Sequence, residues 1–197
     1  MALKKTGYTE KTSKNYLINA ATVYTDVTYA EGAGFTGTLH GATSGGVTVT
    51  IEQTYRDIEV DGTGHTKVKG NKVLESAFAS AVVNLKEITA ESIRQSMNGN
   101  LDTAETADAP TGYKVITAKR YIENTDYIEN MAIVGTLSGT NEPVIVMLDN
   151  VISTGGLELA TEDNNETIIE QTFEAHASVD QLDADEFPWK ILFPSVV

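Results

Sequence analysis

The sequence contains no cysteine, which excludes a disulfide framework, a thiolate nucleophile and a cysteine-ligated metal site. Aromatic residues are only 7% of the 197 residues, with one tryptophan, so an exposed aromatic platform for binding sugars is not expected. No apolar run approaches the roughly 18 residues of a membrane span, and the polar N-terminus lacks the apolar segment of a signal peptide. We therefore expect an intracellularly made protein without membrane contact.

Basic residues are also scarce: 14 Lys and Arg stand against 28 Asp and Glu, a net charge of −14. Such a chain repels the phosphate backbone, which excludes nonspecific nucleic-acid binding. The charge is uneven, because residues 1–14 carry +3 whereas residues 149–187 contain eleven acids and no lysine or arginine. A basic arm and an acidic body can attract each other between copies. The alternative is a floppy tail and a solvated acidic face.

What the sequence does contain is a repeated pattern of β-strands. Val47, Val49 and Ile51 alternate with polar residues and share one face. Residues 76–85 are small or β-branched on both faces, which is typical of a strand covered on both sides, and residues 143–148 form a continuous apolar run that predicts a buried strand.

A further strand is predicted near residues 166–175, where Ile169, Phe173 and Ala175 share one face. Three acids line the opposite face, namely Glu166, Glu170 and Glu174.

One segment predicts a short helix at about residues 89–98. Thr89 is a good N-cap, and Gly99 follows the last turn as a stop. Ile93 and Met97 lie four residues apart, so we expect them to dock the helix on the sheet.

No linker rich in proline or serine divides the chain. We expect an extended basic N-terminal arm over residues 1–14 and a single mainly β domain, a β-sandwich or barrel, over residues 15–197. This domain should include a long loop or hairpin at about residues 52–72. Residues 99–112 predict a polar loop.

The side-chain parity of the strand that contains Val47 changes after Tyr55, where Ile58 and Val60 become the apolar positions. A bulge or a change of partner around Arg56 would produce this change.

The same stretch partly matches a calcium-binding loop, with Asp57, Glu59, Asp61 and Gly62 at the first positions. The match fails because the third position is Glu and the twelfth is Val68, so the bidentate carboxylate is missing. A polar strand or hairpin is the favoured interpretation, and we expect no metal.

Other motifs are equally weak. Residues 32–37 match a dinucleotide-binding glycine pattern, but a strand rather than a helix follows, so we expect no cofactor. His40, His65 and His176 have no ligand or catalytic spacing and are interpreted as surface or packing residues. We expect no catalytic residues, and hence a protein that binds or builds rather than an enzyme.

Several segments, in order, resemble the major tail proteins of tailed bacteriophages, the subunits of the tail tube. The similarity covers roughly residues 15 to 195, and its specificity comes from the order of the motifs rather than from any one of them. The segments that match are residues 39–43 with 45–46, 56–62, 67–70 and 85–93. One departure is His65 and Thr66, which occupy the loop before the "KVKG" segment.

The resemblance implies a β-sandwich or small barrel with one helix, found in the virion tail after synthesis in the host bacterial cytoplasm. It implies six copies in a ring, with rings stacked into a tube through which double-stranded DNA passes transiently and without sequence preference. The implied partners are further copies of the chain and other tail proteins: tape measure, terminator and baseplate or distal tail proteins.

Polarity and flanking strands select candidate contact residues for such an assembly. The subunit-interface candidates are Lys4, Lys5, Tyr55, Arg56, Asp57, Glu59, Asp61, Lys67 and Lys69. The row of Glu166, Glu170 and Glu174 is a candidate for either the lumen or the outer wall.

Three alternatives stay open. The first is another ring-forming protein of related origin, such as a tail terminator or a tube of a prophage, tailocin or secretion system. The second is a β-sandwich module that binds carbohydrate or protein. The third is an enzyme, which would require a metal-dependent activity through His65 or Asp57.

Overall fold

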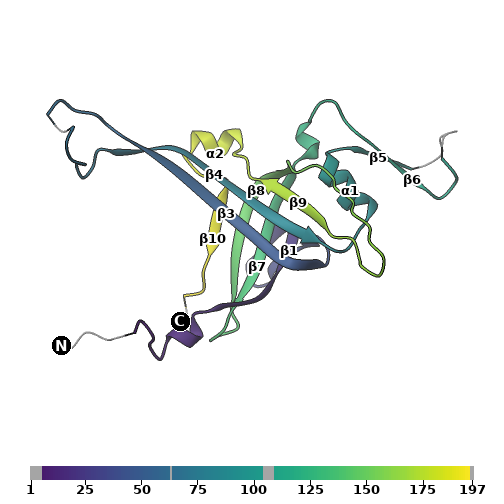
Figure 1. Cartoon of the computed structure of the whole chain (residues 1–197), viewed down its shortest axis with the longest axis horizontal. Helices are drawn as coiled ribbons and strands as arrows, with labels where there is room; N and C mark the ends of the chain where they lie inside the picture. The colour runs from purple at the N-terminus through teal and green to yellow at the C-terminus, as the bar shows by residue number, and fades with distance from the viewer. Residues whose placement is uncertain (1–5, 63, 104–108, 196–197) are drawn as a thin grey trace.

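The computed structural model describes residues 6–62, 64–103 and 109–195, and nearly half of them lie in antiparallel strands (Figure 1). The mainly β class predicted from the sequence is thereby confirmed. The strands are β1 (Leu17–Ala30), β2 (Gly34–Leu39), β3 (Thr43–Asp57), β4 (Lys72–Leu85), β5 (Asn100–Thr103), β6 (Lys114–Thr117), β7 (Ile128–Leu137), β8 (Pro143–Ser153), β9 (Ile169–Glu174) and β10 (Trp189–Leu192). The helical segments are η1 (Thr12–Lys14), α1 (Ala90–Met97), η2 (Asn124–Asp126) and α2 (Val179–Asp183). Within these described ranges, no helix is long and apolar enough to cross a membrane.

Strand β8 joins the two layers of the fold. The sheet runs in the order β2-β1-β7-β8-β9-β4-β3, and β10 pairs with β8 off this path. The first half of β8 pairs with β10, whereas only Ile152 and Ser153 at its end pair with β9. One layer therefore contains β1, β7, β8 and β10, and the other contains β9, β4 and β3. The end of β8 connects the two layers by pairing with β9. A separate hairpin is formed by β5 and β6.

The core lies between these two layers, as in a β-sandwich. The side chains that form it are Val23, Ala79, Ala81, Val83, Met131, Ile133, Leu148, Val151 and Phe173. The half-buried Val47, Val49 and Ile51 of β3 pack against this cluster, as their alternation predicted.

Two sequence predictions about this region are wrong. The segment 76–85 buries only one face, because Ala79, Ala81 and Leu85 are buried while Phe78 on the other face is 67% exposed. The segment 99–112 is not wholly a loop, since its first residues form β5 and pair with β6.

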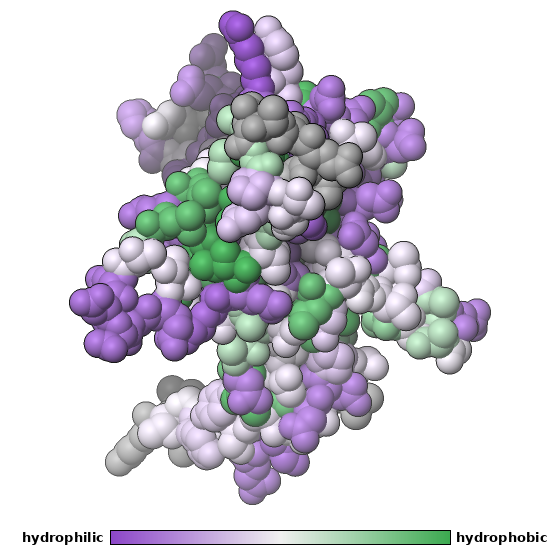
Figure 2. All heavy atoms as spheres, turned by 90° about the vertical axis from the view of Figure 1, so that its right-hand side faces the viewer, coloured by the Kyte–Doolittle hydropathy of each residue, from purple (hydrophilic) through white to green (hydrophobic). Residues whose placement is uncertain are grey.

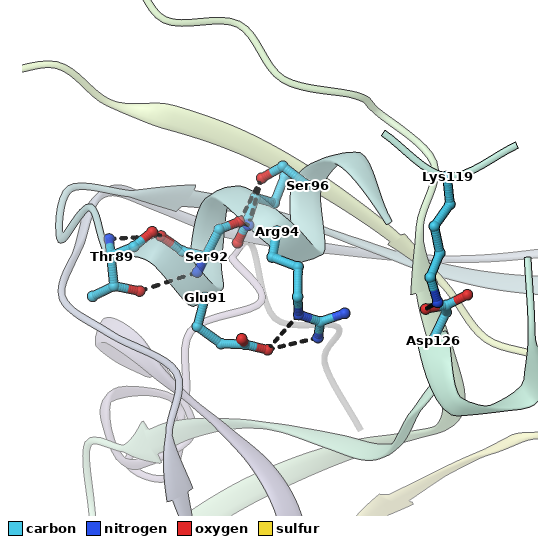
Figure 3. Close-up of polar contacts among 8 residues, drawn as sticks. Thr89, Glu91, Ser92, Arg94, Ser96, Lys119 and Asp126 are labelled. Atoms are coloured by element: carbon cyan, nitrogen blue, oxygen red, sulfur yellow. Dashed lines mark hydrogen bonds and ion pairs between the residues drawn. The ribbon is translucent and has the colours of Figure 1, made fainter. Parts of the chain in front are cut away.

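The helix predicted at about 89–98 is confirmed as α1. Thr89 and Ser92 cap it reciprocally: the Ser92 N–H donates to Thr89 Oγ1 at 3.0 Å, and the Thr89 N–H donates to Ser92 Oγ at 2.9 Å (Figure 3). The left-handed residue at its end is Asn98, with a φ of 48°, rather than Gly99. Gly99 is required for another reason, because a Cβ there would lie 2.6 Å from the Thr117 carbonyl oxygen.

The helix docks through polar groups rather than through Ile93 and Met97, which are only half-buried. The buried side chains are those of Ser92 and Ser96. Gln171 of β9 is also fully buried, and its Nε2 donates to the Ser92 carbonyl oxygen at 2.9 Å and to Ser96 Oγ at 2.7 Å. These buried hydrogen bonds can all form in only one orientation of the helix, so the network fixes the position of α1 on the sheet.

His40 completes this network from the other side of Gln171. Its Nε2 lies 2.8 Å from Gln171 Oε1, and its ring meets Phe173 edge-on at 5.5 Å between centroids. Since Gln171 Nε2 already donates to the helix, its Oε1 accepts here and the imidazole carries its proton on Nε2. Burial lowers the pKa of His40 below its usual value, against the opposing effect of the Gln171 hydrogen bond. His40 is thus the packing histidine that the sequence indicated.

Ion pairs lie within α1 and in the segment that follows β6. Arg94 donates to Glu91 within the helix at 2.6 Å, and Lys119 Nζ donates to Asp126 Oδ1 at 2.7 Å (Figure 3). Burial of Asp126 acts to raise its pKa, but the hydrogen bonds from Lys119 and from the Glu123 N–H outweigh it, so the pKa is lowered.

The face that carries α1 and the β5–β6 hairpin is mostly hydrophilic or neutral, with one hydrophobic patch (Figure 2).

We predict that Gln171→Leu lowers the free energy of unfolding by about 1–3 kcal/mol, because Ser92, Ser96 and His40 each lose a buried hydrogen-bond partner. Urea denaturation measures the change. Glu170→Gln on the exposed face of the same strand is the control and should stay within about 0.5 kcal/mol of wild type. Equal stability of the Leu variant and wild type would contradict the role assigned to Gln171.

We predict that His40 makes stability depend on pH just below neutrality. Because the folded pKa of His40 lies below its usual 6.5, the unfolded chain binds more protons under pH 6.5. Stability is therefore retained above about pH 6.5 and falls as the pH drops below that value. Urea denaturation across this range should show the slope in wild type and a smaller slope in His40→Asn. His65→Asn, in the exposed loop, should keep the wild-type slope, and an unchanged slope in His40→Asn would contradict the prediction.

Candidate assembly surface

The β3–β4 hairpin extends well beyond the rest of its sheet (Figure 1). The two strands pair from Thr43↔Leu85 out to Asp57↔Lys72, whereas β9 accompanies β4 only between Ser80 and Leu85. Every described residue in 52–70 is exposed. This distal half, residues 52–70, therefore contributes little to the core, and it covers most of the segment 52–72 that the sequence indicated as a long loop or hairpin.

A bulge interrupts the hairpin where the sequence parity changes. The register shifts between Thr54 and Tyr55, and Glu75 of β4 is the extra residue. A register shift thus lies close to Arg56, but its extra residue belongs to β4, so it does not change the side-chain parity of β3 as was expected from the sequence. A bulge increases the local twist of a hairpin and re-aims what lies beyond it.

The apolar residues beyond the bulge do not continue a strand face. Ile58 and Val60 follow the end of β3 and are both exposed, in the loop that joins β3 to β4. The Ile58 N–H donates to the Asn71 carbonyl oxygen at 2.7 Å, which extends the ladder by one bond. This loop therefore presents apolar and charged side chains together at the end of the projection.

The base of the loop is closed by a charged pair that the sequence did not reveal. Lys72 Nζ lies 3.2 Å from Asp57 Oδ1 and 6.0 Å from the centre of the Tyr55 ring. Exposed ion pairs of this kind contribute roughly 0–1 kcal/mol, so the pair aligns the strand ends without strongly stabilising the fold. Of the predicted interface residues, Tyr55 and Asp57 lie together here, beside Lys72. The sequence did not indicate Lys72, because its place opposite Asp57 depends on the register of the hairpin.

The other predicted interface residues of this region are exposed. Arg56 lies at the end of β3, and the loop residues are Glu59, Asp61, Lys67 and Lys69. In the described part of the chain, no group of three or more His, Asp or Glu could hold a metal ion. Lys4 and Lys5 lie outside the described residues.

The predicted acidic row is divided in the structure. Glu170 and Glu174 lie on the exposed face of β9, where Glu174 Oε1 accepts from Thr154 Oγ1 at 3.1 Å. Glu166 precedes the strand and is ion-paired with Lys86 at 3.1 Å, and the hydrogen bond from Lys86 lowers its pKa. The three acids therefore do not form one continuous strand row.

The two ends of the sheet are open within the described residues. β2 pairs only with β1, and β3 pairs only with β4. An edge strand presents unpaired N–H and C=O groups that can join another strand. Together with the projecting hairpin, these edges form a surface suited to contact with other chains.

Comparisons with known proteins do not assign this chain to a family. No family model and no curated protein matches this chain. Among solved structures, a chain of the virion of a native gene transfer agent particle is similar. It is 12% identical with a TM-score of 0.39, and the match covers 80% of this chain and 92% of that chain. The score is below 0.5, so the similarity assigns neither a family nor a function.

We predict that Lys72→Glu loosens the distal hairpin without destabilising the fold. Loss of the pair with Asp57 should raise amide hydrogen exchange at Ile58 and its neighbours. The free energy of unfolding should change by no more than about 0.5–1 kcal/mol, because the hairpin end lies outside the core. Lys86→Glu, which breaks the pair with Glu166, is the control and should leave hairpin exchange unchanged. Unchanged exchange in Lys72→Glu would contradict the prediction.

Proposed function

We propose that this chain is a structural virion protein, the major subunit of a phage-type tail tube. Six copies form a ring, and rings stack into the conduit for viral DNA. The observation that carries the proposal is the projecting β3–β4 hairpin, whose described residues in 52–70 are all exposed and which extends beyond the pairing of β4 with β9. The resemblance of ordered sequence segments to major tail proteins supports the same function.

Edge-to-edge contact provides a route to the ring. In this proposal β2 or β3 of one copy joins an open edge of its neighbour, so that the sheets of successive copies become continuous. Each backbone hydrogen bond across such a contact contributes about 0.5–1.5 kcal/mol net, and a ring forms many of them. Closed rotational symmetry leaves no edge exposed, which removes the tendency of open edges to aggregate.

The charge of the chain suits a conduit. A net charge of −14 repels DNA phosphate, so the DNA would pass without being gripped. In this proposal the chain performs no catalysis and needs no cofactor. Its partners are other copies and the remaining tail proteins.

We predict that the purified protein forms rings and tubes in negative-stain electron microscopy. Replacing Asp57, Glu59 and Asp61 with lysine should leave the fold intact by circular dichroism and should abolish tubes. The reason is that the exposed hairpin would then carry the wrong charge at the contact. A matched control replaces three exposed acids elsewhere, Glu158, Glu162 and Asp163, with lysine and should still form tubes.

Two outcomes would contradict the proposal. One is a monomer at all concentrations by light scattering, without rings or tubes. The other is single rings that never stack, which is the behaviour of a tail terminator. Normal tubes from the hairpin variant would exclude the hairpin as the assembly contact.

A further inference from the structure

A groove of about 890 Å³ opens where β4 extends past the end of β9. Its apolar wall is unusually exposed for a single chain, with Phe78 67%, Leu182 65% and Phe187 45% accessible. Phe78 comes from β4, whereas Leu182 belongs to α2 and Phe187 to the segment that follows it. Large apolar side chains gathered in one concave place are typical of a binding site.

One wall of this groove is an open strand edge. The last pair between β4 and β9 is Ser80↔Glu174, and one further bond follows from the Ala175 N–H to the Ala79 carbonyl oxygen at 3.0 Å. Beyond it, residues 72–78 of β4 have β3 on one side and no strand on the other among the described residues. Their outward N–H and C=O groups can therefore pair with an added strand.

The opposite wall is held rigidly. Ser178 caps α2, because its hydroxyl accepts a hydrogen bond from the Gln181 N–H at 3.2 Å. Gln181 Nε2 in turn donates to Asp149 Oδ2 of β8 at 2.9 Å. The helix is thus tied to β8, and the groove exists before any ligand arrives. A preformed groove loses little conformational entropy on binding.

The rim of the groove is acidic. Four carboxylates line it, and no lysine or arginine does: Glu52, Glu174, Asp185 and Glu186. An occupant with a basic charge and an apolar side chain would complement this surface.

The N-terminal arm of the same sequence has this chemistry. Residues 1–14 carry a net charge of +3, and Tyr8 is 60% exposed. Among its described residues, the arm is tied to its own body near its base, where the Gly139 N–H donates to the Lys14 carbonyl oxygen at 3.0 Å and Ser138 Oγ donates to the Ser13 carbonyl oxygen at 2.6 Å. From there it leaves at the end of the molecule opposite α2 (Figure 1).

We propose that the N-terminal arm of a second copy docks in this groove. Tyr8 covers Phe78 and Leu182, Lys11 faces the acidic rim, and the arm backbone pairs with the free edge of β4 at residues 72–78. Because the arm and the groove lie at opposite ends of one copy, the contact is head-to-tail and leaves an unused arm and an unused groove at the two ends. The inference deepens the proposed tube function, in which such a contact would join successive rings.

The absence of native cysteine allows a direct test by disulfide cross-linking of full-length chains. A Gly7→Cys protein, which keeps Tyr8, is mixed with a tagged Leu182→Cys protein under mild oxidation. Both positions are exposed, so neither substitution should disturb the fold. The control acceptor is Ile122→Cys, which is 59% exposed and lies outside the groove. The mixed disulfide with Leu182→Cys should form at least about 10-fold faster than the one with Ile122→Cys, because docking raises the local thiol concentration.

Charge should govern the same reaction. Adding Asp185→Lys and Glu186→Lys to the Leu182→Cys protein should slow the mixed disulfide, and so should high salt, which screens the attraction. Equal rates at the two acceptor positions, or rates indifferent to both charge reversal and salt, would overturn the proposed contact.

Electron microscopy of the wild-type protein separates this inference from the tube function. Rings and tubes without preferential cross-linking to position 182 would overturn the arm contact and leave the tube proposal standing. Preferential cross-linking in a protein that forms neither rings nor tubes would support the contact and overturn the tube.

Discussion

The unequal length of two paired strands determines most of what is distinctive in this molecule. β4 spans Lys72–Leu85, whereas its neighbour β9 spans only Ile169–Glu174, so half of β4 has no strand on that side. The β3–β4 hairpin consequently projects from the sandwich, and its end cannot be stabilised by the core. The same mismatch opens the groove beside Phe78. A projecting element and a receiving surface thus arise from one feature of the sheet.

The body that carries this projection is made rigid by a polar contact. Gln171 is buried and joins α1 to the sheet through Ser92 and Ser96, with His40 on its other side. An apolar stripe could slide or rotate on a sheet, whereas these hydrogen bonds are satisfied in one arrangement only. The helix therefore sits in a defined place, at the cost of sensitivity to any change in the buried amide.

Basic and acidic groups are concentrated in different parts of the molecule. The basic arm leaves one end of the molecule, and α2, which borders the acidic groove, lies toward the other (Figure 1). Opposite charges at opposite ends favour head-to-tail association over symmetric pairing, because like ends repel. The open edges at β2 and β3 lie along the sides of the sheet instead. In the proposed assembly, end contacts and side contacts would therefore use separate surfaces.

The sequence by itself determined the β class, the main buried faces and the α1 helix with its Thr89 cap, because these depend on local periodicity and capping. Only the tertiary structure showed that Phe78 is exposed and that Gln171, a polar residue at an apolar position of β9, is a buried anchor. It also placed Lys72 beside Asp57. These facts depend on which strands pair and where each pairing stops, and strand register is a long-range property that no local pattern contains.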